Sequence, residues 1–163
     1  MVVLRDIEDK DVEAMASLLN NANVVKYLTT RIPFPYTVDD AKWWIDVGSK
    51  EGINKAIEYE GELVGVVGVT PGSFEKEHSG EIGYWLGEKY WGKGIGTEAV
   101  IKMTEIVFDT TSIIRLFAPV FSPNIASSRV LEKCGYYLEA NQKKEFFKNG
   151  NFYDAAVYVK ICS

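Results

Sequence analysis

The segment Tyr90–Ala99, "YWGKGIGTEA", constrains the fold of this chain more than any other. Gly92, Gly94 and Gly96 stand at alternate positions, and the residues that follow have the apolar spacing of a helix through about Asp109. A glycine loop that opens a helix gathers free main-chain amides and lets a ligand approach the backbone, which favours anion binding. The sequence therefore predicts a phosphate-binding turn at this point.

Two familiar phosphate loops fit this segment poorly. The Walker P-loop requires Ser or Thr after its lysine, whereas Lys93 is followed by Gly94. The dinucleotide pattern G-x-G-x-x-A is matched by Gly94, Gly96 and Ala99, but it requires an acidic residue roughly 20 positions later. That region reads "RLFAPVF", and the loop follows two hairpin strands, where no doubly wound sheet has begun. A dinucleotide site is the weaker interpretation.

The chain before the glycine loop predicts strands and two amphipathic helices. Thr37 begins the second helix, because T-V-D-D resembles a capping box. Glu60-Gly61 is a turn signal between two apolar runs, which predicts a hairpin. The expected elements are a strand at 2–7, a helix within 8–20, a loop at 27–37, a helix from Thr37, a hairpin at 54–71 and a strand at 80–87.

The chain after the glycine loop continues this mixed pattern. The run at 113–121 is apolar except for Arg115, as in a buried strand. Asn124 and Gly135 mark the start and end of a short helix, and Asn149-Gly150 is a strong hairpin signal within 143–161. We therefore predict one α+β domain over residues 1–163, largely antiparallel, with one strand–helix–strand crossover near its middle.

Composition narrows the class of partner. The net charge is −5, so no basic excess drives binding to a nucleic-acid backbone. Mild acidity suits a cationic substrate such as an amine, or serves solubility alone. Cys134 and Cys162 form no metal-binding pattern, so no metal is expected. The first residues lack an apolar signal region and no run of ~20 apolar residues occurs, which predicts a soluble cytoplasmic protein without membrane contact.

Two segments together carry a family resemblance. "YWLGEKYWGKGIGTEAV", followed about thirty residues on by "FSPNIASSRVLEKCGY", resembles the acetyl-CoA-binding core of the GNAT superfamily of N-acetyltransferases. Within it, the segments resemble the branch that includes the ribosomal-protein N-terminal acetyltransferases. The resemblance covers nearly the whole chain and implies a mixed, mostly antiparallel sheet of about seven strands flanked by about four helices. The resemblance is compatible with either a monomer or a homodimer.

The resemblance implies where acetyl-CoA binds. Trp91 stands where many relatives have Gln or Arg, and the loop amides after it hold the cofactor pyrophosphate in the family. Asn124 matches an asparagine beside the pantetheine arm, although it also suits a simple helix N-cap. The side chains of Tyr84 and Leu86 suit a core whatever their backbone does. The implied cofactor-binding residues are Tyr84, Trp85, Leu86, Trp91, Gly92, Lys93, Gly94, Ile95, Gly96, Thr97 and Asn124.

The implied reaction is direct acetyl transfer to an amine, and two usual catalytic groups are absent. Many relatives carry a tyrosine acid where this chain has Leu131, and some carry a glutamate base where it has Pro119. Ser127 and Glu81 remain as catalytic candidates, the first near the CoA sulfur and the second as a proton acceptor. The alternatives are a hydroxyl that satisfies the helix start and a solvated carboxylate at a strand end.

The acceptor is less constrained than the cofactor. A depleted set of acids and bases favours an α-amine, whose pKa of ~8 leaves it partly neutral at pH 7, over a lysine amine at ~10.4. We therefore expect an N-terminal acetyltransferase, with Arg31 and Phe34 contacting the substrate. The alternatives are an enzyme for a small-molecule amine, such as a polyamine, amino acid or antibiotic, and a non-catalytic acyl-CoA-binding module.

Overall fold

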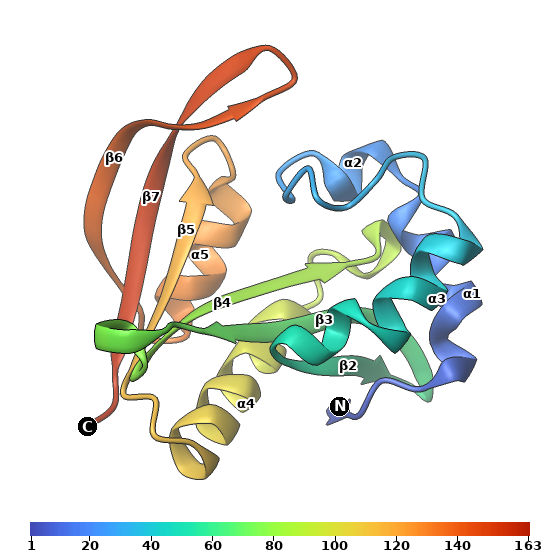
Figure 1. Ribbon diagram of the computed structural model, residues 1–163, viewed down its shortest axis with the longest axis horizontal. Helices are drawn as coiled ribbons and strands as arrows, with labels where there is room; N and C mark the ends of the chain where they lie inside the picture. The colour runs from blue at the N-terminus through green and yellow to red at the C-terminus, as the bar shows by residue number, and fades with distance from the viewer.

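The computed structural model describes residues 1–163 and contains one seven-stranded sheet covered by helices on both faces (Figure 1). None of its helices is both long and apolar enough to span a bilayer. The strands are β1 (Val2–Arg5), β2 (Ile53–Tyr59), β3 (Glu62–Pro71), β4 (Ser79–Leu86), β5 (Arg115–Phe121), β6 (Tyr137–Lys148) and β7 (Asn151–Ile161). The helices are α1 (Val12–Leu19), α2 (Ala22–Val25), α3 (Val38–Asp46), α4 (Ile95–Thr110) and α5 (Ile125–Lys133), with 3-10 turns η1 (Asp9–Asp11), η2 (Gly48–Glu51), η3 (Phe74–Lys76) and η4 (Glu88–Tyr90).

The strand order is β1-β2-β3-β4-β5-β7-β6. Every neighbouring pair is antiparallel except β4 and β5, which are parallel and are joined through α4. The predicted α+β class, the mostly antiparallel sheet and the single crossover are thereby confirmed.

The parallel pair is short, and this feature positions the site. β4 and β5 share register only where Ser79–Glu81 faces Arg115–Phe117. Beyond that point β4 continues alongside β3 as far as Leu86, and β5 continues alongside β7 as far as Phe121. The second halves of the two strands therefore have no ladder between them.

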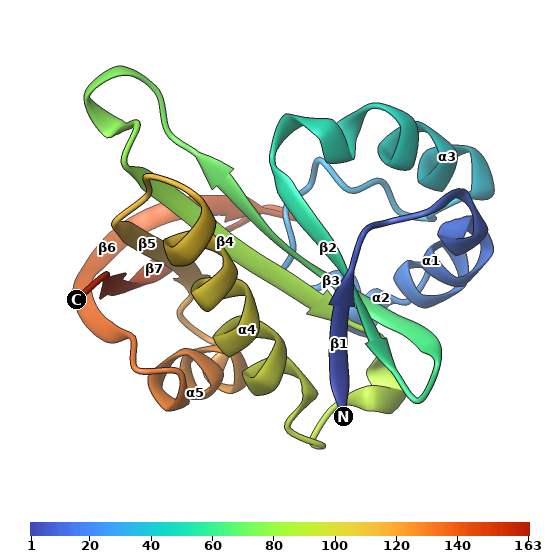
Figure 2. The same cartoon turned by 90° about the horizontal axis from the view of Figure 1, so that it is seen from below.

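Helices cover the two faces of the sheet with separate cores. α4 and α5 lie on one face and α1 and α3 on the other (Figure 2). The α4 face is built on side chains at helical spacing, including Ala99, Val100, Met103 and Val107, all without exposed surface. The other core gathers Met15, Leu19, Ala41 and Ile45.

Two local features differ from the sequence prediction. β6 begins at Tyr137 rather than near Lys143, because residues 137–142 belong to an edge strand with mostly exposed side chains and so lack the apolar alternation of a half-buried strand. The short helix α2 was not predicted, and it begins where the Asn21 side chain accepts a hydrogen bond from the Asn23 N–H at 2.9 Å.

Candidate active site

A cavity of about 400 Å³ lies where β4 and β5 separate. Its floor comes from β4 at Glu81–Tyr84, and one wall comes from the end of β5 and the first turn of α5. The opposite wall is the segment Tyr27–Thr30 after α2, and Phe146–Lys148 of β6 complete the lining. Segments far apart in the sequence thus form a single site.

The glycine loop has the conformation that an anion site requires. Gly92 and Gly94 have φ of +73° and +78°, a region that side chains disfavour, and a Cβ at either position would meet no atom within 4 Å. Gly94 is the N-cap of α4 and no side chain caps the helix, whose first backbone bond runs from Glu98 N to Gly94 O. The N–H groups of residues 95–97 are therefore free to bind an anion at the positive end of the helix dipole.

Trp91 connects this loop to β4. Its indole Nε1 donates to the main-chain oxygen of Leu86 at 3.0 Å, although the residue keeps 46% of its surface exposed. Behind the loop, a Cβ on Gly96 would lie 3.2 Å from Cε2 of Tyr84, so α4 packs closely on β4 here. The glycine loop is therefore held against β4 by Trp91 before it and by the close packing of Gly96 after it.

The backbone of β4 presents unpaired groups toward the cavity. The Gly87 N–H donates to Val64 O in β3, so strand alternation turns the main-chain groups of Ile82, Tyr84 and Leu86 toward β5. β5 does not pair with that stretch, and the Leu86 oxygen accepts its hydrogen bond from the Trp91 indole instead. An extended ligand arm can therefore add to this edge as a strand would.

The side chains of Tyr84 and Leu86 belong to the core or pack against it, as the sequence predicted. Leu86 is buried in the α4 core and Tyr84 packs against that core, whereas Trp85 points to the opposite face and packs beside α1 and α3. Any contact of Trp85 or Leu86 with a cofactor would therefore use mainly the backbone, whereas Tyr84 also lines the cavity.

Glu81, Tyr84 and Ser127 converge on the cavity. Glu81 makes no ion pair, and although the residue as a whole is accessible, crowding of its carboxyl by the cavity walls raises its pKa through desolvation. Burial likewise raises the pKa of Tyr84, against the lowering effect of the neighbouring Ser127 hydroxyl. A carboxylate that can act as a base and the hydroxyls of Tyr84 and Ser127 therefore line the same cavity.

Asn124, Pro119 and Leu131 also line the cavity. The Asn124 side chain accepts from the Ser127 N–H at 3.3 Å, so it does cap α5. Pro119 and Leu131 occupy positions where many relatives have a base and an acid, and neither side chain can transfer a proton. Acid–base chemistry in this cavity therefore falls to other residues.

The two residues expected to contact the substrate lie outside the cavity lining. Arg31 has 80% of its side chain exposed and pairs with Glu51 at 3.5 Å. Phe34 is 54% exposed. The expected segment does contribute a wall, but Tyr27–Thr30 form it rather than Arg31 and Phe34.

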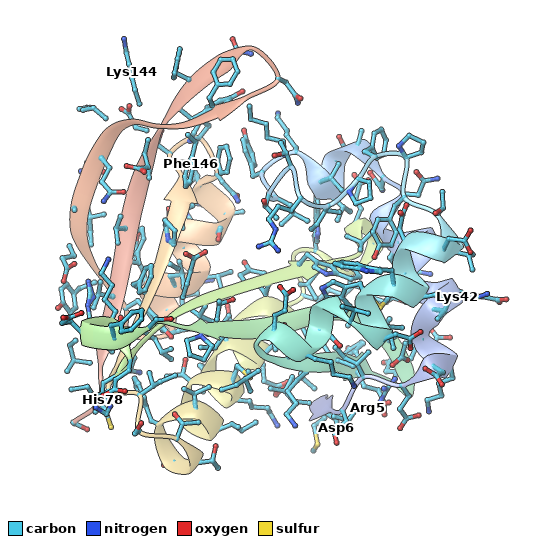
Figure 3. All side chains as sticks on the ribbon, in the orientation of Figure 1. Arg5, Asp6, Lys42, His78, Lys144 and Phe146 are labelled. Carbon is cyan, nitrogen blue, oxygen red and sulfur yellow. The ribbon has the colours of Figure 1, made fainter.

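Sequence reasoning missed Lys148 and an aromatic group beside it. Lys148 Nζ donates to Val25 O at 2.6 Å and to Leu28 O, which ties β6 to the end of α2, and burial lowers its pKa. Phe146 stacks on Phe121 with ring centroids 4.3 Å apart, and Figure 3 shows Phe146 near the end of β5, at the opposite end of the molecule from His78. No local sequence pattern reveals the contact of Lys148 with Val25 and Leu28, because these residues are more than 100 positions apart in the chain.

Residues 2–137 match the family model described as acetyltransferase (GNAT) domain. The chain belongs to this family. It is 30% identical to the uncharacterized N-acetyltransferase YoaA of Bacillus subtilis (strain 168), over 96% of this chain and 91% of that one. It is 26% identical to the putative ribosomal N-acetyltransferase YdaF of the same organism, over 96% and 89%.

Solved structures agree with this assignment. A GNAT-family acetyltransferase from Bacillus anthracis aligns with a TM-score of 0.85 at 27% identity, covering 98% of this chain and 94% of that one. The fold is also that of RimL, the ribosomal L7/L12 alpha-N-protein acetyltransferase, with a TM-score of 0.85 at 23% identity over 99% and 94% of the chains. The protein is therefore an acyltransferase with the GNAT fold, and the resemblance noted in its sequence is confirmed.

Proposed function

We propose that this acyltransferase moves an acetyl group from acetyl-CoA directly to a primary amine, and that the acceptor is the N-terminal α-amine of a protein or peptide. The observation that carries the proposal is the convergence of Glu81, Tyr84 and Ser127 on one cavity beside the unpaired edge of β4. Acetyl-CoA supplies the thioester that is cleaved.

The residues present fit the cofactor. The free N–H groups at the start of α4 suit the pyrophosphate, and Lys93 adds a positive charge next to them. The open edge of β4 suits the amide groups of a pantetheine arm. The microcin C7 self-immunity acetyltransferase MccE, 27% identical with a TM-score of 0.85, is described in complex with acetyl-CoA and AMP.

The proposed chemistry needs a base, an acid and a donor for developing negative charge. Glu81 would accept the proton of the amine, because the raised pKa of its carboxyl makes it a better base than a glutamate with the ordinary pKa. As the C–N bond forms and the C–S bond breaks, the Tyr84 hydroxyl, which lines the cavity with Ser127, would give a proton to the leaving sulfur. Main-chain N–H groups on the open edge of β4 would stabilise the oxyanion.

We propose an α-amine as acceptor because the cavity offers few side chains that can transfer a proton. An α-amine with a pKa of ~8 loses its proton far more readily than a lysine amine at ~10.4. A small-molecule amine is the second candidate, since a cavity of about 400 Å³ holds a free amino acid and one relative is the L-amino acid N-acetyltransferase AaaT of Escherichia coli, 23% identical over 98% of both chains.

Two measurements test the proposal. Thermal unfolding with acetyl-CoA, CoA and NAD should show a raised midpoint with the first two ligands only, by mass action. Thiol release with a panel of peptides, amino acids and polyamines should be fastest with peptides, and mass spectrometry should place the acetyl group on the α-amine. A midpoint shift with NAD alone would remove the cofactor assignment, and acetylation confined to small amines would replace the acceptor.

A further inference from the structure

The cavity carries a balanced pair of charges. Among its lining side chains only Glu81 and Lys148 are charged at neutral pH, and they belong to β4 and β6. Every other lining side chain is uncharged, and more than half of the lining residues are hydrophobic. An acceptor therefore meets one carboxylate and one ammonium.

Lys148 has no acidic partner. Its Nζ is held by the neutral carbonyls of Val25 and Leu28, and no ion pair in the molecule includes it. Nζ also lies 5.9 Å from the centroid of the Phe121 ring. Two carbonyls use two of the three N–H donors of an ammonium, and its charge is not cancelled by a nearby carboxylate.

The surroundings of Lys148 are apolar and aromatic. Phe121 contacts Phe146 with centroids 4.3 Å apart, Tyr153 at 5.4 Å and Tyr27 at 5.9 Å. Low-polarity walls weaken the screening of a charge, so a second cation entering this end of the cavity would be repelled more strongly than at the protein surface. An alkyl or aromatic group placed there would gain contact area instead.

We propose that the acceptor site takes a monoamine whose body is uncharged and apolar, and that Lys148 rejects acceptors with a second cation. This inference rests on the proposed function. In this site Glu81 receives the only amine of the acceptor. The aromatic side chains around Lys148 pack against the body of the acceptor, and Lys148 disfavours basic side chains and polyamines. For a peptide acceptor, the first residue is therefore uncharged and apolar rather than Lys or Arg.

A matched pair of acceptors tests the proposal in the unmodified protein. Norleucinamide and lysinamide share an unbranched four-carbon side chain, to which lysinamide adds a terminal ammonium. We expect kcat/KM for α-acetylation, expressed per neutral α-amine, to be at least tenfold higher for norleucinamide. Equal values, or a preference for lysinamide, would overturn the inference and leave the proposed function standing. If neither compound nor any peptide is acetylated, the proposed function fails and the inference fails with it.

Two variants separate charge from structural support. Lys148→Met removes the charge and the bond to α2, whereas Lys148→Arg keeps the charge. The preference for norleucinamide should fall to about threefold or less in Lys148→Met and persist in Lys148→Arg. A purely structural Lys148 would lower both kcat/KM values by the same factor and leave their ratio unchanged, and that result would overturn the assignment.

Discussion

The indole Nε1 of Trp91 donates a hydrogen bond to the main-chain oxygen of Leu86, 3.0 Å away. This bond joins the first residue of the glycine loop to the end of the unpaired edge of β4. Trp91 stands where many GNAT relatives have Gln or Arg, and its indole is directed to the strand rather than to the loop amides. Phosphate binding here would therefore depend on main-chain amides that Trp91 positions.

Trp91→Phe keeps an aromatic ring and removes the donor. A hydrogen bond of this kind contributes about 1 kcal/mol, so we expect the KM for acetyl-CoA to rise about fivefold, with a smaller change in the KM for the acceptor. Steady-state kinetics with each substrate varied in turn measure the difference. Trp43→Phe is the control, because Trp43 is similarly exposed but lies on α3. Equal effects of the two substitutions would contradict the role of Trp91.

Gly94→Ala tests the conformation of the loop. At φ +78° an added side chain costs about 1 kcal/mol, a fall in Tm of about 2–4 °C for a domain of this size. The added methyl group would also stand beside the free amides and reduce acetyl-CoA affinity. Gly61→Ala is a matched control, since Gly61 has φ +80° and equally open surroundings in the β2–β3 turn. Both variants should lose stability, and only Gly94→Ala should lose affinity in calorimetry.

Asp11, the residue before α1, forms a bidentate pair with Arg5 of β1, at 2.8 and 2.9 Å. Burial alone would raise the pKa of Asp11, but hydrogen bonds from Arg5 and the Glu8 N–H outweigh it and lower the pKa. The stabilisation is therefore present above the ordinary aspartate pKa and is lost as pH falls through the lowered one. We expect Asp11→Ala to cost about 3 kcal/mol in urea unfolding at pH 7, because it breaks a pair whose carboxylate is buried. The difference from the parent should shrink in acid, and a constant difference would contradict the pairing.

The features that the sequence predicted well depend on local physics. Three features require particular residues at fixed spacing and can therefore be recognised in the sequence: the glycine loop, the capping box at Thr37 and the Asn149-Gly150 turn. Glu81 was predicted from its place at the start of a strand, and Ser127 from the family resemblance and its place on the first turn of a helix. The structure brings both to the cavity, and their catalytic roles stay predictions.

The features that the sequence did not reveal depend on distant contacts. Lys148 reads as one charge in a polar hairpin until the fold brings it to the carbonyls of Val25 and Leu28. Arg31 and Phe34 were predicted because their loop stands where the family has its variable substrate wall, and that resemblance does not tell which residues of the loop face inward. The start of β6 was missed because an exposed edge strand has no apolar face to alternate.

Glu81→Gln tests the proposed base through pH dependence. Deprotonation of the amine alone gives log kcat/KM a slope of one against pH below its pKa. Because desolvation raises the pKa of Glu81, the carboxylate becomes protonated at a less acidic pH than usual, and below that pH the slope should increase to two. Glu81→Gln should lower kcat/KM about 100-fold at neutral pH and keep a slope of one throughout. An unchanged profile would exclude Glu81 from proton transfer.

Tyr84→Phe and Ser127→Ala separate the acid from the residue that supports it. Burial raises the pKa of Tyr84 and the neighbouring Ser127 hydroxyl lowers it, so removing that hydroxyl should raise the pKa further. We expect Tyr84→Phe to reduce kcat about 100-fold with little change in either KM, because a general acid acts mainly in the transition state. Ser127→Ala should reduce kcat by about tenfold and move the alkaline decline of kcat to higher pH, since a less acidic tyrosine stays protonated longer. If instead Ser127→Ala is the more damaging variant and leaves the alkaline decline in place, Ser127 itself protonates the sulfur and Tyr84 only packs against α4.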